Sequence, residues 1–272
     1  MTTTTAASTT ATSATPAAAP AVPAVYAAAI GRSTRAILRS PALLISPLAQ
    51  SLFFLIVYAG QLGTVGEGYL SGDSFIAFLL PLILLTGAAT GAGAAGTLVL
   101  GDLDSGYLDR LRLAHGSNAP FLTGAVVAAL IAVALQTVAT IAGAMAIGYG
   151  PGGVAGLAGM IALLTALALG IALLSIAVAI RTRTAAATGL VTLAVFGLSF
   201  FTGVFAPVEA LTPWMRAIAT VNPLTYVIDA ARQLEAGTAP AALPIAVAVL
   251  ATLIIAGIVS CTLASIHARR NR

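Results

Sequence analysis

The chain has 272 residues, of which 59% are hydrophobic and only 7% are Asp, Glu, Lys or Arg. Soluble domains carry about 25% charged residues, so this composition excludes an ordinary soluble fold and predicts an all-α integral membrane protein. All 12 basic residues are arginine, so the chain lacks a Walker A lysine and is not itself a P-loop ATPase. Its single cysteine, Cys261, excludes an internal disulfide framework and a cysteine-based metal cluster.

Residues 1–23 consist almost entirely of Thr, Ala, Ser and Pro. They cannot bury enough apolar surface to offset the entropy of ordering, so we expect a disordered tail. Residues 24–40 predict an amphipathic helix, because Arg32, Arg35 and Arg39 fall on one side and apolar residues on the other. The arginine stripe favours a helix lying on an anionic membrane surface. The alternative is a solvated helix packed on other protein.

Six stretches are candidates for transmembrane helices, since a bilayer core of about 30 Å needs roughly 20 apolar residues. They lie within residues 41–272, which we expect to form one transmembrane domain. The spans cover about 42–61, 74–98, 121–148, 154–180, 185–205 and 243–266, and none contains an internal charge. With six spans, ten of the 12 arginines fall on one side of the membrane, and only Arg216 and Arg232 on the other. The positive-inside rule then predicts that both termini are cytoplasmic.

The second span contains only Gly, Ala and Thr between Gly87 and Gly96. Gly91 to Gly96 formally match the G-x-G-x-x-G dinucleotide-binding motif. However, no strand precedes them and they sit at membrane depth, so we interpret this stretch as a close-packing face for another helix.

A short charged segment, residues 101–118, lies between the second and third spans. Asp102 is placed to cap a short helix, with acidic residues in its first turn and arginines near its end. Leu103, Tyr107 and Leu111 recur every four residues and form an apolar stripe. We therefore predict a short amphipathic helix on the cytoplasmic face, for which an inert loop helix is the alternative.

Two short helices are predicted on the outer side, between the fifth and sixth spans. Thr-Pro at 212–213 and Asn-Pro at 222–223 are each typical of an N-cap followed by proline at the first helical position. The second helix, 223–236, places Asp229 and Arg232 as an i,i+3 pair opposite an apolar face. Neither helix is long enough to span a bilayer, which predicts a re-entrant or interfacial hairpin.

These two segments resemble motifs of the membrane subunits of ABC-2-type transporters, a group that includes daunorubicin/doxorubicin exporter permeases. The resemblance covers nearly all of the chain from about Tyr26. It is most specific at Asp102, Gly106, Leu108, Asp109, Arg110 and Leu111, and at Asn222, Pro223, Tyr226, Asp229 and Arg232. The chain departs from the family pattern where Leu103 and Asp104 replace Arg-Glu, His115 replaces proline and Asn118 replaces arginine.

The resemblance implies a permease in a bacterial plasma membrane that forms a homodimer or heterodimer and is driven by a separate ATP-binding subunit. This chain would be no enzyme and hold no cofactor, because ATP and Mg²⁺ would bind the partner. Both the interfacial helix and a second, coupling helix would contact that partner. The coupling helix would comprise Asp102, Leu103, Asp104, Gly106, Tyr107, Leu108, Asp109, Arg110 and Leu111. Closure of the ATP-binding subunits would then switch the spans between alternating-access states.

Other function classes fit the residues less well. An ion-coupled secondary transporter normally has ionisable groups within its spans, but these spans offer only Gln50, Gln136 and hydroxyl groups. A membrane-embedded enzyme would need clustered His, Asp, Glu or Cys at membrane depth. The arginines are spread along the whole chain, unlike a nucleic-acid patch. The two histidines are far apart, so we predict no metal site.

Aromatic residues of the first and fifth spans suggest a substrate class. The candidates for a substrate lining are Phe53, Phe54, Tyr58, Phe196, Phe200 and Phe201. Packing in the core or against lipid is one explanation for them. The other is an aromatic passage suited to a planar hydrophobic compound. We therefore expect efflux of a drug-like or lipid-like compound, as in antibiotic resistance, with export of a polysaccharide or glycolipid as the alternative.

Overall fold

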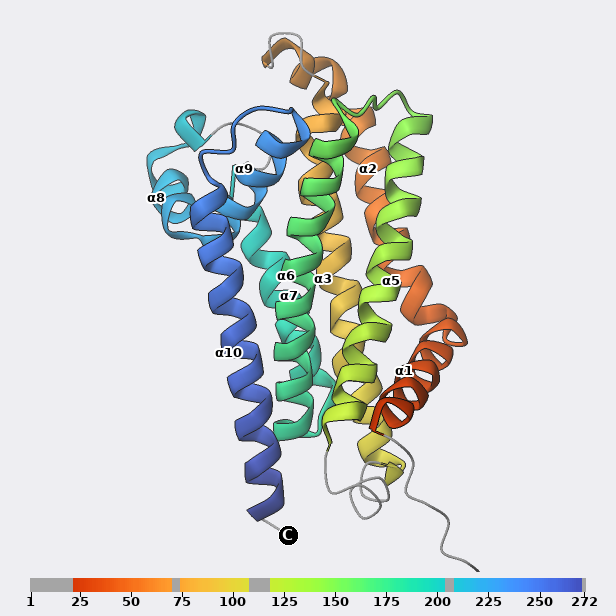
Figure 1. Ribbon diagram of the computed structural model, residues 1–272. Helices are drawn as coiled ribbons and strands as arrows, with labels where there is room; N and C mark the ends of the chain where they lie inside the picture. The colour runs from red at the N-terminus through yellow and green to blue at the C-terminus, as the bar shows by residue number, and fades with distance from the viewer. Residues whose placement is uncertain (1–21, 70–73, 108–117, 204–207, 271–272) are drawn as a thin grey trace, which may run out of the picture.

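The computed structural model describes residues 22–69, 74–107, 118–203 and 208–270, without the side chains of 62–69 and 268–270. Over these residues all regular secondary structure is helical, and the long helices run side by side in one bundle (Figure 1). The helices are α1 Val22–Leu38, α2 Pro41–Tyr69, α3 Phe75–Asp104, α5 Ala119–Ala146, α6 Val154–Thr182, α7 Ala185–Phe200, η1 Val208–Ala210, α8 Pro213–Val221, α9 Pro223–Glu235 and α10 Leu243–Arg270.

Five helices of the described chain are long and apolar enough to cross a membrane. They are α2 over Pro41–Gln61, α3, α5, α6, and α10 over Leu243–His267. Helix α7 is apolar but has 16 residues, about 24 Å at 1.5 Å per residue, which is shorter than a bilayer core of about 30 Å. The predicted fifth span continued to residue 205, whereas residues 204–207 lie outside the described part. The sixth span therefore stays a prediction.

Helix α3 is the centre of the bundle and contacts α2, α5, α6, α7 and α9. Its glycines allow this close packing. A Cβ at Gly87 would lie 2.0 Å from the Ser51 hydroxyl of α2, and one at Gly96 would lie 2.8 Å from the Ser175 carbonyl oxygen of α6. The sequence prediction of a close-packing face is confirmed.

The end of α3 differs from the prediction. The helix continues to Asp104, and a glycine in the left-handed region, Gly106 with φ +66°, follows it. Asp102 therefore lies in the last turn of α3, and the prediction that it caps a separate helix is wrong. The predicted coupling residues Leu108, Asp109, Arg110 and Leu111 lie outside the described residues.

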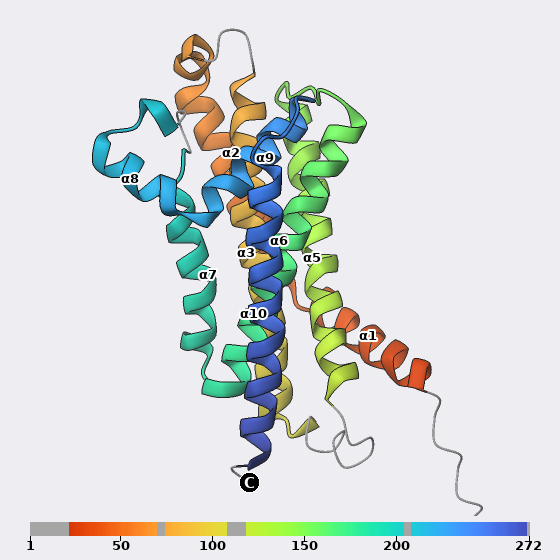
Figure 2. The same cartoon turned by 60° about the vertical axis from the view of Figure 1, so that its left-hand side comes forward.

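The two ends of the bundle differ in charge. The C-terminus, the α6–α7 turn and the start of α1 lie at one end, which we call the arginine-rich end (Figure 1). Helices α8 and α9 and the α5–α6 loop lie at the other, the hairpin end, while α1 leans obliquely against the foot of α5 (Figure 2). Among the described arginines, Arg32, Arg35 and Arg39 belong to α1 and the turn after it, Arg181 and Arg183 to the end of α6 and the turn after it, and Arg269 and Arg270 to the end of α10. Arg216 in α8 and Arg232 in α9 belong to the hairpin end.

Candidate functional sites

At the arginine-rich end, Arg32 joins α1 to the last turn of α3. Its Nη1 donates a hydrogen bond to Asp102 Oδ2 at 2.9 Å, and its Nη2 donates to Oδ1. The same guanidinium lies over the Tyr107 ring, 3.8 Å from the ring centroid. The hydrogen bond to Asp102 raises the pKa of Arg32, against the opposing effect of burial. A carboxylate at a helix C-terminus is normally unfavourable, and this two-bonded pair offsets that cost for Asp102.

The remaining contacts of α1 run along α5. Helix α1 buries Ala29, Ser33 and Ile37, and a Cβ at Gly124 of α5 would lie 2.8 Å from the Ala29 carbonyl oxygen. Tyr107 is the last residue that the structure describes before 108–117. Its ring contacts Phe121 near the start of α5, with ring centroids 6.2 Å apart. The described residues on both sides of 108–117 are therefore tied to α1. The three arginines of the predicted stripe have different surroundings, because Arg32 binds Asp102 while Arg35 and Arg39 are exposed.

The predicted aromatic residues largely gather between α2 and α7. Phe54 stacks on Tyr58 with centroids 5.3 Å apart, and it also meets Phe196 at 5.9 Å and Phe200 at 6.3 Å. Phe53 joins the edge of this cluster through Phe54 and is 60% exposed. Phe201 makes no ring contact with another described aromatic residue. We call Phe54, Tyr58, Phe196 and Phe200 the aromatic cluster.

A groove of about 540 Å³ adjoins the aromatic cluster and separates α2 from α7, with α3 also contributing to its lining. Its wall is built mainly from small residues, with Phe196 among the larger side chains. Thr90 on α3 donates a hydrogen bond to Gln50 Oε1 on α2 at 2.7 Å, so part of the polar lining is already paired. The polar side chains of this groove are Ser46, Gln50, Thr90, Thr97, Thr188 and Thr192.

At the hairpin end, Asn222 holds the start of α9 against the end of α7. Its Oδ1 accepts a hydrogen bond from the Leu224 backbone N–H at 3.0 Å, which caps α9. Its Nδ2 donates to the carbonyl oxygens of Leu198 at 2.7 Å and Phe201 at 3.1 Å. Tyr226 donates to the Thr220 carbonyl oxygen at 2.7 Å. The predicted helix starts at Pro213 and Pro223 are confirmed.

Arg232 of α9 reaches across to α3. Its Nε donates to the Phe78 carbonyl oxygen at 2.9 Å, its Nη1 donates to the Gly203 carbonyl oxygen at 2.8 Å, and its guanidinium lies 3.7 Å from the Phe78 ring centroid. The predicted pair with Asp229 is present, with Nη1 and Oδ1 3.5 Å apart. Burial raises the pKa of Asp229, although Arg232 opposes the shift. The Arg232 side chain is only 13% exposed, although the sequence placed it opposite the apolar face of this helix.

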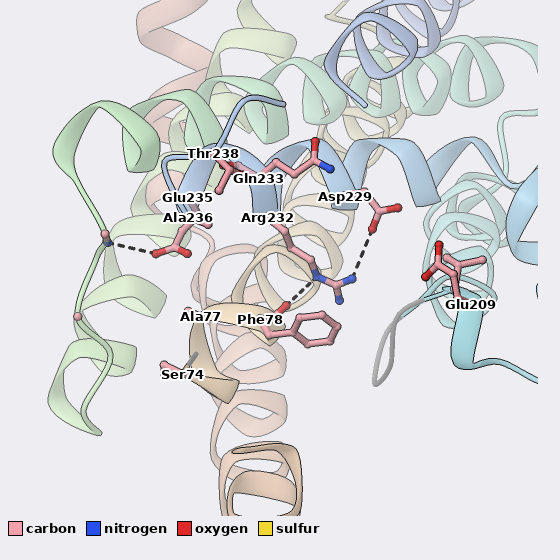
Figure 3. Close-up of a pocket in the computed structure, with 13 residues that line it drawn as sticks. Ser74, Ala77, Phe78, Glu209, Asp229, Arg232, Gln233, Glu235, Ala236 and Thr238 are labelled. Carbon is pink, nitrogen blue, oxygen red and sulfur yellow. Dashed lines mark hydrogen bonds and ion pairs between the residues drawn. The ribbon is translucent and has the colours of Figure 1, made fainter. Parts of the chain in front are cut away.

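Phe78, Asp229 and Arg232 line a cavity of about 620 Å³ at the hairpin end (Figure 3). We call it the outer cavity, after the side of the membrane on which the sequence analysis predicts the α8–α9 region. Glu235 at the end of α9 also lines the cavity and connects α9 to the α5–α6 loop. Glu235 Oε1 accepts hydrogen bonds from the Tyr149 hydroxyl at 2.7 Å and from the Gly152 backbone N–H at 3.4 Å. Burial, followed by the hydrogen bond to Glu235, raises the pKa of Tyr149. Gly156 permits the approach, since a Cβ there would lie 2.1 Å from the Leu234 carbonyl oxygen.

Comparison with known proteins agrees with this arrangement. Residues 25–236 match the ABC-2 type transporter family, a region that runs from α1 to the end of α9. The chain belongs to the ABC-2 type transporter family. It is also 24% identical over 210 residues to the daunorubicin resistance ABC transporter permease protein DrrB1 of Streptomyces coeruleorubidus, a match covering 76% of this chain and 74% of that protein. This chain is therefore a multi-pass membrane subunit of an ABC transporter, in which ATP hydrolysis belongs to a separate subunit.

Sequence reasoning about this ABC-2 subunit missed three contacts. The Arg32–Asp102 pair joins residues 70 positions apart, Tyr149–Glu235 joins residues 86 apart, and Arg232–Phe78 joins residues 154 apart. A weak signal existed for two of them, because Asp102 and Arg232 are matching positions of the family motifs. The partners Arg32 and Phe78 carry no local signal, because each is one member of an ordinary helical pattern.

Proposed function

We propose that this chain is the permease subunit of an exporter driven by ATP, moving a hydrophobic, drug-like or lipid-like compound out of the cell by alternating access. The observation that carries this proposal is the groove between α2, α3 and α7, together with the aromatic cluster beside it. Small residues and hydroxyl groups leave room along the groove, while the rings offer flat apolar faces. Such a lining suits a planar hydrophobic compound better than a hydrated sugar chain.

The orientation follows from the distribution of arginine. Ten of the 12 arginines belong to the end with the termini if α7 completes a sixth crossing. The similarity to a Streptomyces permease favours a bacterial plasma membrane. The positive-inside rule then puts both termini in the cytoplasm, and α8 and α9, as a re-entrant hairpin, on the outer face. Labelling of single cysteines tests this, in a background where Cys261 is replaced by serine. Positions 150 and 210 should react from outside and position 182 should not; the reverse pattern would contradict the orientation.

Coupling to the ATP-binding partner is proposed for the segment from Asp102 to Leu111. Helix α1 contacts Asp102 and Tyr107 in the first half of this segment and the start of α5 that follows it. A force applied to the segment would therefore also act on α1, α3 and α5. Two copies of the chain, or this chain and a related one, would complete the transporter within the lipid bilayer.

Transport by the purified complex tests the function. The chain would be reconstituted in liposomes with its ATP-binding subunit, and ATP-dependent accumulation would be measured for an anthracycline, a fluorescent phospholipid and an oligosaccharide. We expect accumulation of the anthracycline or the phospholipid. Accumulation of the oligosaccharide alone would favour the polysaccharide alternative, and accumulation driven by an ion gradient without ATP would favour a secondary transporter.

A further inference from the structure

The outer cavity has the dimensions of a small-molecule site. Its volume of about 620 Å³ falls within the roughly 300–1,000 Å³ typical of ligand pockets. Four separate parts of the chain build its wall: the start of α3, the α5–α6 loop, η1 and α9 (Figure 3). The Arg232 and Tyr149–Glu235 hydrogen bonds hold three of these parts together, namely α3, the α5–α6 loop and α9. The cavity is therefore preformed, and its wall is not a surface loop alone.

The charge of the lining favours a cation. Three carboxylates line the cavity, Glu209, Asp229 and Glu235, against the single cation Arg232. Arg232 is already engaged by Asp229 and by two backbone carbonyl oxygens. The carboxylates of Glu209 and Glu235 form no ion pair among the described residues, although Arg216 donates to the Glu209 backbone carbonyl oxygen.

Glu235 provides a second, independent indication of a ligand. The residue is only 6% exposed, and both of its hydrogen bonds reach the same oxygen, Oε1. No described residue donates to Oε2, although Glu235 lines the cavity. Oε2 is therefore an acceptor open to the cavity rather than a sealed, unsatisfied atom, and an N–H group in the cavity can donate to it in place of water.

We propose that the outer cavity binds the ammonium group of an organic amine. Glu235 accepts a hydrogen bond from the ammonium nitrogen, the exposed Glu209 adds negative charge at the rim, and Ala77, Phe78 and Val208 contact the apolar part of the molecule. A metal ion is a poorer occupant, because no group of three His, Cys, Asp or Glu side chains in the described chain is placed to hold one. The amine belongs either to a soluble compound or to the ethanolamine headgroup of a lipid.

A matched pair of fluorescent probes isolates the charge. Monodansylcadaverine carries a primary ammonium group, and its N-acetyl derivative has nearly the same shape without the charge. Both would be titrated against the full chain in dodecyl maltoside, a neutral detergent without amines. We expect the amine to bind at least about tenfold more tightly than the acetyl derivative, as for a hydrogen bond with a charged partner.

The variants Glu235→Gln and Glu209→Gln should each weaken binding of the amine probe, by up to about tenfold. Binding of the acetyl derivative should stay the same. Glutamine at 235 still accepts the Tyr149 hydrogen bond, and an unchanged melting temperature would verify the fold. Glu209→Asp, which keeps the charge, should retain most of the binding. Equal binding of the two probes, or amine binding that is unchanged in both glutamine variants, would overturn the proposal.

Adding phosphatidylethanolamine to the micelles distinguishes the two sources of the amine. Displacement of the probe by this lipid, but not by phosphatidylglycerol, would identify a headgroup site. Lack of displacement would identify a site for a soluble amine. A role of the site in export rests on the proposed function, whereas binding to the isolated chain does not. ATP-driven transport that persists when probe binding fails would overturn this inference alone.

Discussion

Arg32 and Arg232 hold opposite ends of the same helix, α3, with similar sets of groups. Each guanidinium lies over an aromatic ring, Tyr107 at 3.8 Å for Arg32 and Phe78 at 3.7 Å for Arg232. Each also has an aspartate partner. The two sites nevertheless differ in what receives the hydrogen bonds and in how much water reaches the charge.

The Arg32 site is a charge pair near the surface. Its aspartate accepts two hydrogen bonds, and the Arg32 side chain is 38% exposed. The Arg232 side chain is only 13% exposed, its aspartate is 3.5 Å away, and its short hydrogen bonds go to carbonyl oxygens of Phe78 and Gly203. Water reaches the Arg32 guanidinium and can replace its partner there, although the Asp102 side chain is only 13% exposed. A buried guanidinium cannot leave without stranding carbonyl oxygens.

The comparison suggests different roles for the two ends of α3. In the proposed transport cycle, the arginine-rich end would be the part that opens and closes, because it lies next to the proposed coupling segment. The hairpin end acts as a fixed anchor that keeps α3, α9 and the residues after α7 together. Substitutions at the two arginines should therefore affect different measured quantities.

The largest effect is expected for Arg232→Ala. This change leaves the Phe78 and Gly203 carbonyl oxygens without their donor and Asp229 without its counter-charge, so we expect a loss of about 3 kcal/mol in the free energy of unfolding. Unfolding in SDS, followed by circular dichroism, measures it. Arg216→Ala is the matched control, because Arg216 is an exposed arginine of the same hairpin. Equal losses in both variants would show that Arg232 is not an anchor.

The second effect concerns coupling at the arginine-rich end. Arg32→Gln or Asp102→Asn should cost less than about 1 kcal/mol of stability, yet reduce drug-stimulated ATP hydrolysis by the complex several-fold. The charge exchange Arg32→Asp with Asp102→Arg should restore part of the stimulation. Arg35→Gln, which changes an exposed arginine on the same helix, serves as the control. Full stimulation in both single variants would mean that this pair plays no part in coupling.

The third effect lies in the aromatic cluster between the two ends. Phe200→Ala removes a ring that meets both Phe54 and Phe196, so the ratio of transport rates between two drugs should change about threefold or more. Phe201→Ala is the natural comparison, because Phe201 neighbours Phe200 in sequence but stands outside the cluster. A similar change in both variants, or only a loss of protein level, would indicate packing instead of substrate contact.

Local sequence rules predicted the elements that local physics determines. Long apolar stretches predicted the long helices, and proline after Thr212 and Asn222 predicted the starts of α8 and α9. The glycines of α3 predicted its packing face. The rules failed at Asp102, where a capping residue after glycine suggested a new helix. Helix α3 continues through it because Arg32, 70 residues earlier, neutralises the carboxylate at the helix end.

The sequence did not predict the outer cavity either, because its wall also depends on contacts between residues far apart in the chain. Asp229 and Arg232 were correctly paired by their i,i+3 spacing, but nothing in that spacing shows that Arg232 is buried against Phe78. Glu235 likewise looks like an ordinary polar residue at a helix end. Only the folded chain brings Tyr149 to it, through a loop whose glycines allow the approach.

The last effect is the pH dependence of stability at the hairpin end, which Tyr149→Phe tests. The change removes one buried hydrogen bond to Glu235, so stability should fall by about 1 kcal/mol near neutral pH. The wild-type chain should also lose stability as the pH rises above about 10. In that range the unfolded tyrosine releases its proton, whereas the folded Tyr149, with its raised pKa, still holds it. Unfolding in SDS between pH 8 and 11 should therefore show a steeper decline for wild type than for Tyr149→Phe, with Tyr26→Phe in α1 as the control. Parallel declines would mean that Tyr149 ionises as easily in the folded chain as in the unfolded one. The Arg32 pair should add no such slope, because arginine stays charged over this whole range.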